Sequence, residues 1–316
     1  MKEIFLDKNE NAFDIPENLK YELMEYIKKT PFNRYPEKGL PTLLEKIGDF
    51  LGFNQENIIA GNGSDELLNL IISSSRGNVL INSPTFEMYS FYAKNYGRGI
   101  TDIPLRDDFS IDVDAIKKAG NTGLIVICSP NNPTGNLISK NDIQEVLDLN
   151  IPTILDNAYF EFSEEDYTPM INDYDNLIIL RTFSKAFSMA GLRVGYGIAS
   201  EKTASVLKSL QAPFYLNILS AKMAEIMIDN YSYVREKIKY IIDERERVYR
   251  HVKDIAYESR ANFLYLRHDL YDFMEKKGIH IRKLPLVKDR SRITIGTKEE
   301  NDIAINAMDE FMENKL

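Results

Sequence analysis

The amino-acid sequence predicts an α/β fold, in which a mostly parallel sheet carries helices on both faces and is followed by a smaller α+β part. Over about 150 of the 316 residues, short apolar runs rich in β-branched residues alternate with helical patterns, which is typical of parallel strands joined by helices. The apolar runs show no polar alternation, as expected of strands buried on both faces. Beyond about residue 218 the alternation stops.

The first part of the chain supplies the predicted sheet. Its strands are expected at five short apolar runs: residues 79–81, 124–127, 153–155, 177–180 and 196–199. The helical patterns between them cover about residues 64–75, 85–96, 112–119, 140–149 and 201–210. This order predicts a sheet with helices on both faces.

The C-terminal third has a different organisation. One long, charged helical segment is expected from Ile218 to Lys253, and its charges are explained by a solvated face. Short strands are expected at residues 263–266, 280–282 and 292–295. We therefore predict a large domain over residues 30–230 and a small domain built from both chain ends, residues 1–29 and 231–316.

The last predicted helix begins with a capping box, in which Thr297 and Glu300 satisfy the first backbone amides. Ile303, Ala307 and Phe311 recur at every fourth position after it. This spacing predicts that the three side chains form one packed face.

Composition excludes several classes of protein. The 39 Lys+Arg against 48 Asp+Glu give a net charge of −9, which argues against nucleic-acid or membrane-surface partners. The longest apolar run, residues 124–128, is far shorter than the roughly 20 residues of a membrane helix. The chain has one cysteine and three scattered histidines, so no metal site or internal disulfide is expected. With acids within residues 1–7 in place of a secretion signal, these features predict a cytoplasmic protein.

The first of three segments with chemical potential surrounds Lys185, which directly follows a predicted buried strand. Burying a lysine is costly unless it is neutralised or used covalently, and a Schiff base with an aldehyde meets that condition. The neighbouring Ser184 and Arg193 are suited to bind a phosphate. An exposed loop lysine explains this segment equally well when it is taken alone.

The second segment, Gly-Asn-Gly-Ser-Asp-Glu at residues 61–66, ends a strand and begins a helix. Glycines allow close approach of a ligand, and the first amides of a helix bind anions. Ser64 either caps the helix or donates to a phosphate. The segment lacks both the dinucleotide fingerprint and the P-loop pattern, so an ordinary helix cap is the alternative.

The third segment is a pair, residues 129–135 (Ser-Pro-Asn-Asn-Pro-Thr-Gly) and 156–159 (Asp-Asn-Ala-Tyr). Both follow predicted parallel strands, where open α/β sheets bind ligands. Asp156 at the end of an apolar strand needs a partner such as a protonated ring nitrogen, while Asn132 and Tyr159 could hold a phenolic oxygen. Turn chemistry alone also explains the first loop. Together, the three segments match the requirements of pyridoxal 5′-phosphate.

The same segments resemble those of the fold-type-I pyridoxal-phosphate-dependent aminotransferases. The likeness covers residues 129–135, 156–159 and 183–196, and it extends from residues 9–11 to residues 292–296. Within this family it is closest to the histidinol-phosphate aminotransferases. The resemblance implies two-domain fold-type-I architecture and amino transfer from histidinol phosphate to 2-oxoglutarate in histidine biosynthesis. Threonine-phosphate decarboxylation and aromatic amino-acid transamination, both carried out on similar scaffolds, are the alternatives.

The resemblance also implies roles for single residues. Lys185 would be the Schiff-base lysine, with Asp156 on the pyridine nitrogen, and both would be catalytic together with Tyr159. The remaining contacts implied by the family are Asn132 with Tyr159 at the phenolic oxygen, Phe86 on the ring, Ser64, the Asp65 amide, Ser184 and Arg193 at the phosphate, and Tyr35 reaching that phosphate from the partner subunit of a homodimer. On the substrate side, Arg292 would bind a carboxylate and Arg282 a phosphate, with Asn132 nearby.

The family pattern is not followed everywhere. Asn157 stands where the family commonly has Glu, and Ala12 replaces a frequent Pro. Neither position has a predicted chemical role.

Other classes of function fit the sequence less well. A non-catalytic pyridoxal-phosphate-binding module would not need the lysine, the carboxylate and both arginines. A hydrolase could be sought in Ser205 and Lys208, but this pair falls in an ordinary helical pattern. Cys128 is expected in the core and His280 receives no role. The aromatic residues Phe86, Tyr89, Phe91, Tyr92 and Tyr96 are expected on one helix, mostly in the core, with only Phe86 at the ligand.

Overall fold

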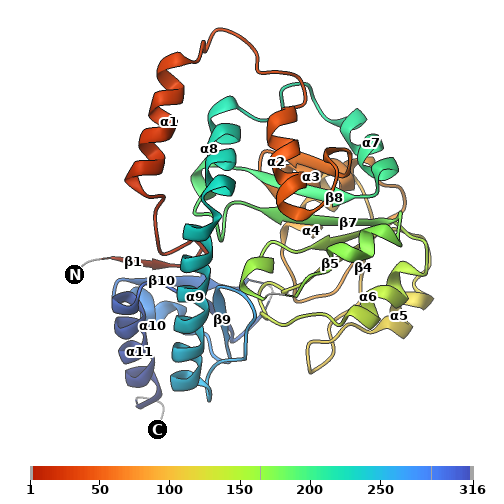
Figure 1. Ribbon diagram of the computed structural model, residues 1–316. Helices are drawn as coiled ribbons and strands as arrows, with labels where there is room; N and C mark the ends of the chain where they lie inside the picture. The colour runs from red at the N-terminus through yellow and green to blue at the C-terminus, as the bar shows by residue number, and fades with distance from the viewer. Residues whose placement is uncertain (1–2, 164, 286, 314–316) are drawn as a thin grey trace.

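The computed structural model describes residues 3–163, 165–285 and 287–313, and its larger sheet has seven strands (Figure 1). The strand order is β2-β8-β7-β6-β5-β3-β4, and only β8 is antiparallel to its neighbours. The strands are β2 (Ile58–Gly61), β3 (Asn78–Ile81), β4 (Ile100–Asp102), β5 (Thr122–Cys128), β6 (Thr153–Asp156), β7 (Leu177–Thr182) and β8 (Gly195–Ala199). The predicted mostly parallel sheet is confirmed, and β4 is a strand that the prediction missed.

Apart from the edge strand β4, the strands of this sheet are buried on both faces, which explains their continuous apolar sequences. In β5, Leu124 and Val126 belong to one core cluster, whereas Ile125 and Ile127 belong to the other. Successive side chains of a strand point to opposite faces, so each apolar run supplies two separate cores.

Helices follow several of these strands close to the predicted positions. They are α3 (Ser64–Ser74), α4 (Met88–Asn95), α5 (Val113–Lys118), α6 (Lys140–Leu147) and α7 (Glu201–Leu210). Asp112, Ser139 and Ser200 cap α5, α6 and α7 by accepting a bond from an amide three residues on. Helix α4 begins later than predicted, and Phe86 and Glu87 therefore precede it. Short 3₁₀ turns lie at Gln55–Asn57, Phe160–Phe162, Thr168–Asn172 and Ala190–Leu192.

The smaller sheet is made from both ends of the chain. Its order is β1-β10-β11-β9, from β1 (Ile4–Leu6), β9 (Phe263–Leu266), β10 (Ile279–Lys283) and β11 (Ser291–Thr294). Strand β1 is parallel to β10, with Ile4 opposite Ile279. Helices α10 (Tyr271–Glu275) and α11 (Lys298–Glu313) lie beside this sheet (Figure 1). The domain boundaries at residues 29/30 and 230/231 stay a prediction.

Two helices precede the larger sheet, α1 (Glu17–Lys29) and α2 (Pro41–Leu51), and both pack against α8 (Ile218–Asp229). The single helix predicted for residues 218–253 is wrong, because α8 and α9 (Tyr231–Val252) are separate. Asn230, with φ −108° and ψ 31°, lies between them outside the helical region. Its side chain donates to the Ile226 carbonyl and ends α8.

The capping box of α11 is confirmed. The Glu300 carboxylate accepts from the Thr297 amide at 2.9 Å, and the Thr297 hydroxyl accepts from the Glu300 amide at 3.3 Å. The packed face predicted through Ile303 is wrong, since Ile303 is 49% exposed. Four residues advance about 40° beyond one helical turn, so a strict fourfold spacing drifts around the helix. The buried face instead contains Ala304, Ala307 and Met308.

Within the described ranges, no helix combines the length and apolar character needed to cross a membrane.

Candidate functional site

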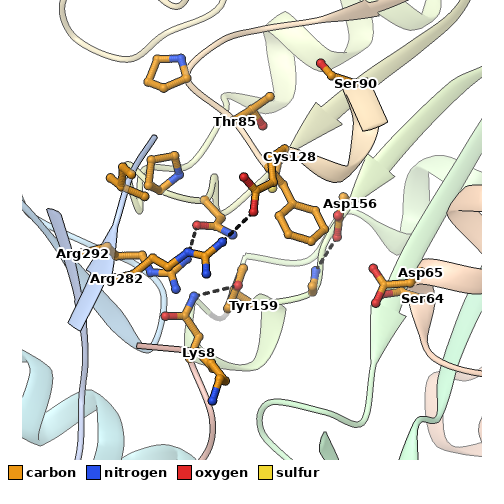
Figure 2. Close-up of a pocket in the computed structure, with 18 of the residues that line it drawn as sticks. Lys8, Ser64, Asp65, Thr85, Ser90, Cys128, Asp156, Tyr159, Arg282 and Arg292 are labelled. Atoms are coloured by element: carbon orange, nitrogen blue, oxygen red, sulfur yellow. Dashed lines mark hydrogen bonds and ion pairs between the residues drawn. The ribbon is translucent and has the colours of Figure 1, made fainter. Parts of the chain in front are cut away.

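A cavity of about 490 Å³ lies where the strands β5, β6 and β7 end. It is bounded by residues of both sheets and of the chain segment that follows β1. Figure 2 shows Arg282 and Arg292 on one side of it and Ser64 and Asp65 on the other. The predicted site residues that line it are Ser64, Asp65, Phe86, Asn132, Asp156, Tyr159, Ser184, Lys185, Arg193, Arg282 and Arg292.

Asp156 is the last residue of β6, directly opposite Cys128 of β5. One carboxylate oxygen accepts from the Ala158 amide at 3.2 Å, and the other accepts from the Tyr89 hydroxyl at 2.7 Å. Burial raises the pKa of Asp156 to about 6, and the Tyr89 hydrogen bond opposes that rise. The group is therefore a carboxylate at neutral pH and can hold a cationic ring nitrogen.

Lys185 follows β7 and points its amine toward the segment after β1. Its Nζ donates to the carbonyl oxygen of Lys8 at 3.0 Å. Burial first, and then the positive charge of Arg292, lowers the pKa of Lys185 to about 8. About a tenth of this amine is therefore unprotonated at pH 7, far more than for an ordinary lysine, and this is the form that attacks a carbonyl or accepts a proton.

Ser64 and Asp65 form the first turn of α3, next to Arg193 and Ser184. The Arg193 guanidinium donates to the Asp65 carboxylate at 2.8 Å and to the Ser184 hydroxyl at 3.2 Å. A Cβ at Gly195 would lie 2.1 Å from the Ser64 nitrogen, so only glycine allows β8 to approach the helix this closely. Helix amides, a guanidinium and hydroxyls together form an anion site suited to a phosphate. We call Ser64, Asp65, Ser184 and Arg193 the phosphate cup.

Asn132 and Tyr159 both line the cavity. The Asn132 carbonyl oxygen accepts from Arg292 at 2.6 Å, and the Tyr159 hydroxyl oxygen accepts from the Asn9 amide at 2.9 Å. These contacts use the acceptors of both side chains and leave them donor groups for a ligand oxygen. Burial raises the pKa of Tyr159 to about 12, so its hydroxyl keeps its proton.

Two arginines from the smaller sheet line the cavity, and they differ in burial and in hydrogen-bond partners. Arg292 of β11 is buried, and its second guanidinium nitrogen donates to the Asp7 carbonyl at 2.6 Å, while its Nε has no hydrogen-bond partner. Burial lowers the pKa of Arg292 to about 10, which still leaves it charged at neutral pH. Arg282 of β10 is half-exposed and donates to the Glu87 carboxylate at 2.6 Å.

Tyr35 is the one predicted site residue that lies outside this cavity. Its side chain is 80% exposed and stacks on Phe214, with 4.4 Å between ring centroids. It borders a second cavity of about 310 Å³ between the loop after α1 and helices α2 and α8. Its predicted contact with a partner subunit's site stays a prediction.

Sequence reasoning missed Tyr89 and Asn9, and it also missed Glu87, which lines the cavity and accepts a hydrogen bond from Arg282. The aromatic residues around α4 were expected mostly in the core, but Phe91 and Tyr96 are 50% and 43% exposed. Tyr89 is fully buried, yet its hydroxyl serves Asp156. A buried tyrosine needs a partner for its hydroxyl, which was a usable signal. Asn9 bonds both Tyr159 and Thr294, far along the chain, and no local pattern reveals that.

The geometry favours one kind of ligand. Within the described ranges, no cluster of three or more His, Cys, Asp or Glu side chains could hold a metal ion. Instead, an amine of lowered pKa, a phosphate cup, a buried carboxylate and two donors for an electron-rich oxygen surround one space. This set defines a site for a phosphorylated aromatic aldehyde with a basic ring, as in enzymes that work through a lysine-bound cofactor.

Comparison with known proteins places the chain in a family. The family model for aminotransferases of class I and II matches residues 2–308, and the chain belongs to that family. It is 47% identical over 313 residues to the histidinol-phosphate aminotransferase of Pyrococcus furiosus, covering 98% of this chain and 93% of that relative. The corresponding enzyme of Thermococcus kodakarensis is 42% identical over 98% of this chain and 92% of its own length.

Solved structures agree with the fold. The histidinol-phosphate aminotransferase from Clostridium acetobutylicum superimposes with a TM-score of 0.90 at 28% identity, over 99% of this chain and 100% of that one. The resemblance and the fold class predicted from the sequence are thus confirmed.

Proposed function

We propose that this chain is a pyridoxal-phosphate-dependent aminotransferase that uses histidinol phosphate as amino donor and 2-oxoglutarate as acceptor, in histidine biosynthesis. The observation that carries the proposal is the meeting of Lys185, Asp156 and the phosphate cup in one cavity. The 47% identity with a histidinol-phosphate aminotransferase supports the choice of donor. Arg282 and Arg292 supply positive charge for the anionic groups of both substrates.

The described residues fit pyridoxal phosphate. The phosphate cup offers amides, hydroxyls and a guanidinium, and Gly195 keeps the helix start accessible. Asp156 suits a protonated ring nitrogen, and the donors of Asn132 and Tyr159 suit the phenolic oxygen. When bound, this cofactor supplies an aldehyde that bonds an amine and a ring that accepts electrons as a neighbouring C–H bond breaks.

The protein's own side chains would transfer the proton and bind the substrates. Lys185 would hold the cofactor through its aldehyde, and its Nζ, when free, would accept the proton from the donor's α-carbon. The pKa of about 8 makes that amine competent as a base near neutral pH. Arg292 would bind the carboxylate of the oxo acid, a role supported by its position in the cavity lining and its charged guanidinium.

The proposal includes a homodimer and a cytoplasmic location. Exposed apolar residues on α1 and the following loop, among them Tyr21, Met24, Phe32 and Tyr35, support burial of this region against a second subunit. A second subunit would also give Tyr35 its predicted place at the partner's phosphate. The single, buried cysteine agrees with a reducing compartment.

A single-turnover assay tests the function. The purified protein with pyridoxal phosphate is mixed with histidinol phosphate, threonine phosphate or an aromatic amino acid, and the cofactor's absorbance is followed. We expect the fastest change with histidinol phosphate and none in the Lys185→Ala variant. Faster reaction with either alternative donor, or turnover by Lys185→Ala, would refute the assignment.

A further inference from the structure

One ion pair crosses the cavity between the two sheets. Arg282 lies on β10 of the smaller sheet, and Glu87 precedes α4, which packs on the larger sheet. Their side chains are 42% and 41% exposed, and the guanidinium donates to the carboxylate at 2.6 Å. Both residues line the cavity beside Phe86. The dashed contact of Arg282 is visible in Figure 2.

The pair differs from the other arginine contacts of the cavity. Arg292 is buried and held by an amide oxygen and a backbone carbonyl, so it stays a fixed cation with spare donors. Arg282 is instead neutralised by a carboxylate in a solvent-accessible place. Such half-exposed pairs are weak, and a ligand anion can replace Glu87 on the guanidinium.

When a ligand anion displaces Glu87 from Arg282, the displacement has a second consequence. Once an anion occupies Arg282, the Glu87 carboxylate loses its partner but remains in the cavity wall. It is then a negatively charged acceptor that favours a ligand N–H or cation and repels a second ligand carboxylate. A ligand with both an anionic group and a ring N–H supplies a new partner for Arg282 and for Glu87, whereas a dicarboxylate supplies a new partner only for Arg282.

We propose that Glu87 is a specificity-determining residue. When the donor's phosphate binds Arg282, the Glu87 carboxylate gives up its contact with that arginine and binds the imidazole ring of the amino donor instead. This inference rests on the proposed function. By this exchange Glu87 favours a donor that carries both phosphate and imidazole, and it weakens the binding of ligands that carry only carboxylates.

Glu87→Gln tests the exchange, because it removes the charge while keeping the size of the side chain. Asp102→Asn is the matched control. Asp102 lines the same cavity and accepts a bond from the Ser83 amide, which an asparagine oxygen can also accept, and its described contacts do not include Arg282. Two ligands are titrated into the pyridoxal-phosphate-loaded enzyme: succinate, which has no amine, and histidinol phosphate in single turnover.

We expect opposite changes in Glu87→Gln. Succinate should bind up to about fivefold tighter, the size of a half-exposed ion pair, while the apparent affinity for histidinol phosphate should fall about tenfold. Asp102→Asn should change neither by more than about twofold. In an Arg282→Gln background, Glu87→Gln should no longer tighten succinate. Changes of the same sign for both ligands, or equal effects of Asp102→Asn, would overturn the proposal.

The two proposals fail differently. If histidinol phosphate does not react with the unmodified enzyme, the proposed function is wrong, and the imidazole half of the exchange falls with it. The succinate titration still decides whether Glu87 competes for Arg282, since succinate needs no reaction. Unchanged succinate binding in Glu87→Gln refutes that competition even where histidinol phosphate turns over normally.

Discussion

The hydrogen bond from Tyr89 to Asp156 gives the sharpest test of how this site is built. Tyr89 is fully buried, and its hydroxyl lies 2.7 Å from a carboxylate that is itself buried. Tyr89→Phe removes one oxygen and keeps the ring, including its edge-on contact with Phe86, in which the ring centroids are 5.6 Å apart. The change therefore removes the hydrogen bond that Tyr89 donates to Asp156 without removing the ring. Tyr89 acts through Asp156 and is a positioning residue.

The size of the effect follows from the charge state of Asp156. A hydrogen bond to a charged group contributes about 1.5–3 kcal/mol, and about 1.4 kcal/mol corresponds to one pKa unit. Losing the Tyr89 donor should raise the pKa of Asp156 by about one to two units above its value of about 6. The carboxylate would then be partly protonated at pH 7, and the affinity for pyridoxal phosphate should fall about 10- to 100-fold.

The sign of the pH dependence can be checked without the cofactor. Because burial raises the pKa of Asp156 above that of the unfolded chain, its protonated form favours folding, and this stability is lost as pH rises through about 6. The Tyr89 hydroxyl reduces that loss by stabilising the carboxylate. The difference in unfolding free energy between the unmodified protein and Tyr89→Phe should therefore grow from pH 5 to pH 8.

Two measurements test this reasoning: cofactor titration from pH 6 to 9, and urea unfolding of the cofactor-free protein over pH 5 to 8. Tyr96→Phe, at the far end of the same helix and exposed to solvent, is the matched control. An unchanged cofactor affinity, together with a stability difference that does not vary with pH, would show that Tyr89 does not set the charge of Asp156.

Three further predictions concern the rest of the site. Gly195→Ala should weaken cofactor binding at least tenfold, because its Cβ would lie 2.1 Å from the Ser64 nitrogen. Gly191→Ala, whose Cβ would have nothing within 4 Å, should leave the titrated affinity unchanged, and equal affinities for both variants would contradict the close approach. The rate at which the cofactor-free protein captures pyridoxal phosphate should rise with pH through about 8, since only the unprotonated Lys185 attacks; stopped-flow absorbance that shows a flat profile from pH 7 to 9 would contradict this. Tyr35→Ala should weaken cofactor binding about tenfold while leaving the unfolding of the single chain nearly unchanged, because Tyr35 is 80% exposed within it; an unaltered affinity would exclude a contact supplied by the partner subunit.

Much of the site followed from sequence because its residues sit at strand ends. Asp156, Lys185 and the loop with Asn132 all follow buried parallel strands, and such strands bring their carboxyl ends to one edge of a sheet. Short apolar runs fixed the strands, and glycines marked the start of α3. These signals are local, so a single sequence contains them in full.

The sequence prediction fails at two places for local reasons. The Asn230 side chain ends α8 by donating to the Ile226 carbonyl, and a strict fourfold spacing turns Ile303 away from the buried face of α11. The domain boundaries and the roles of the individual site residues stay predictions, to be tested by the variants above.

By itself, the sequence determined the larger sheet, the lysine and carboxylate at its edge, and the resemblance to the class I and II aminotransferases. Only the tertiary structure decided that Asn9 would reach Tyr159, that Tyr89 would serve Asp156, and that Glu87 would face Arg282. The physical reason is the distance along the sequence over which each kind of interaction acts. Strand and helix patterns act over a few neighbouring residues, whereas these hydrogen bonds join segments far apart in the sequence that meet only in the folded chain.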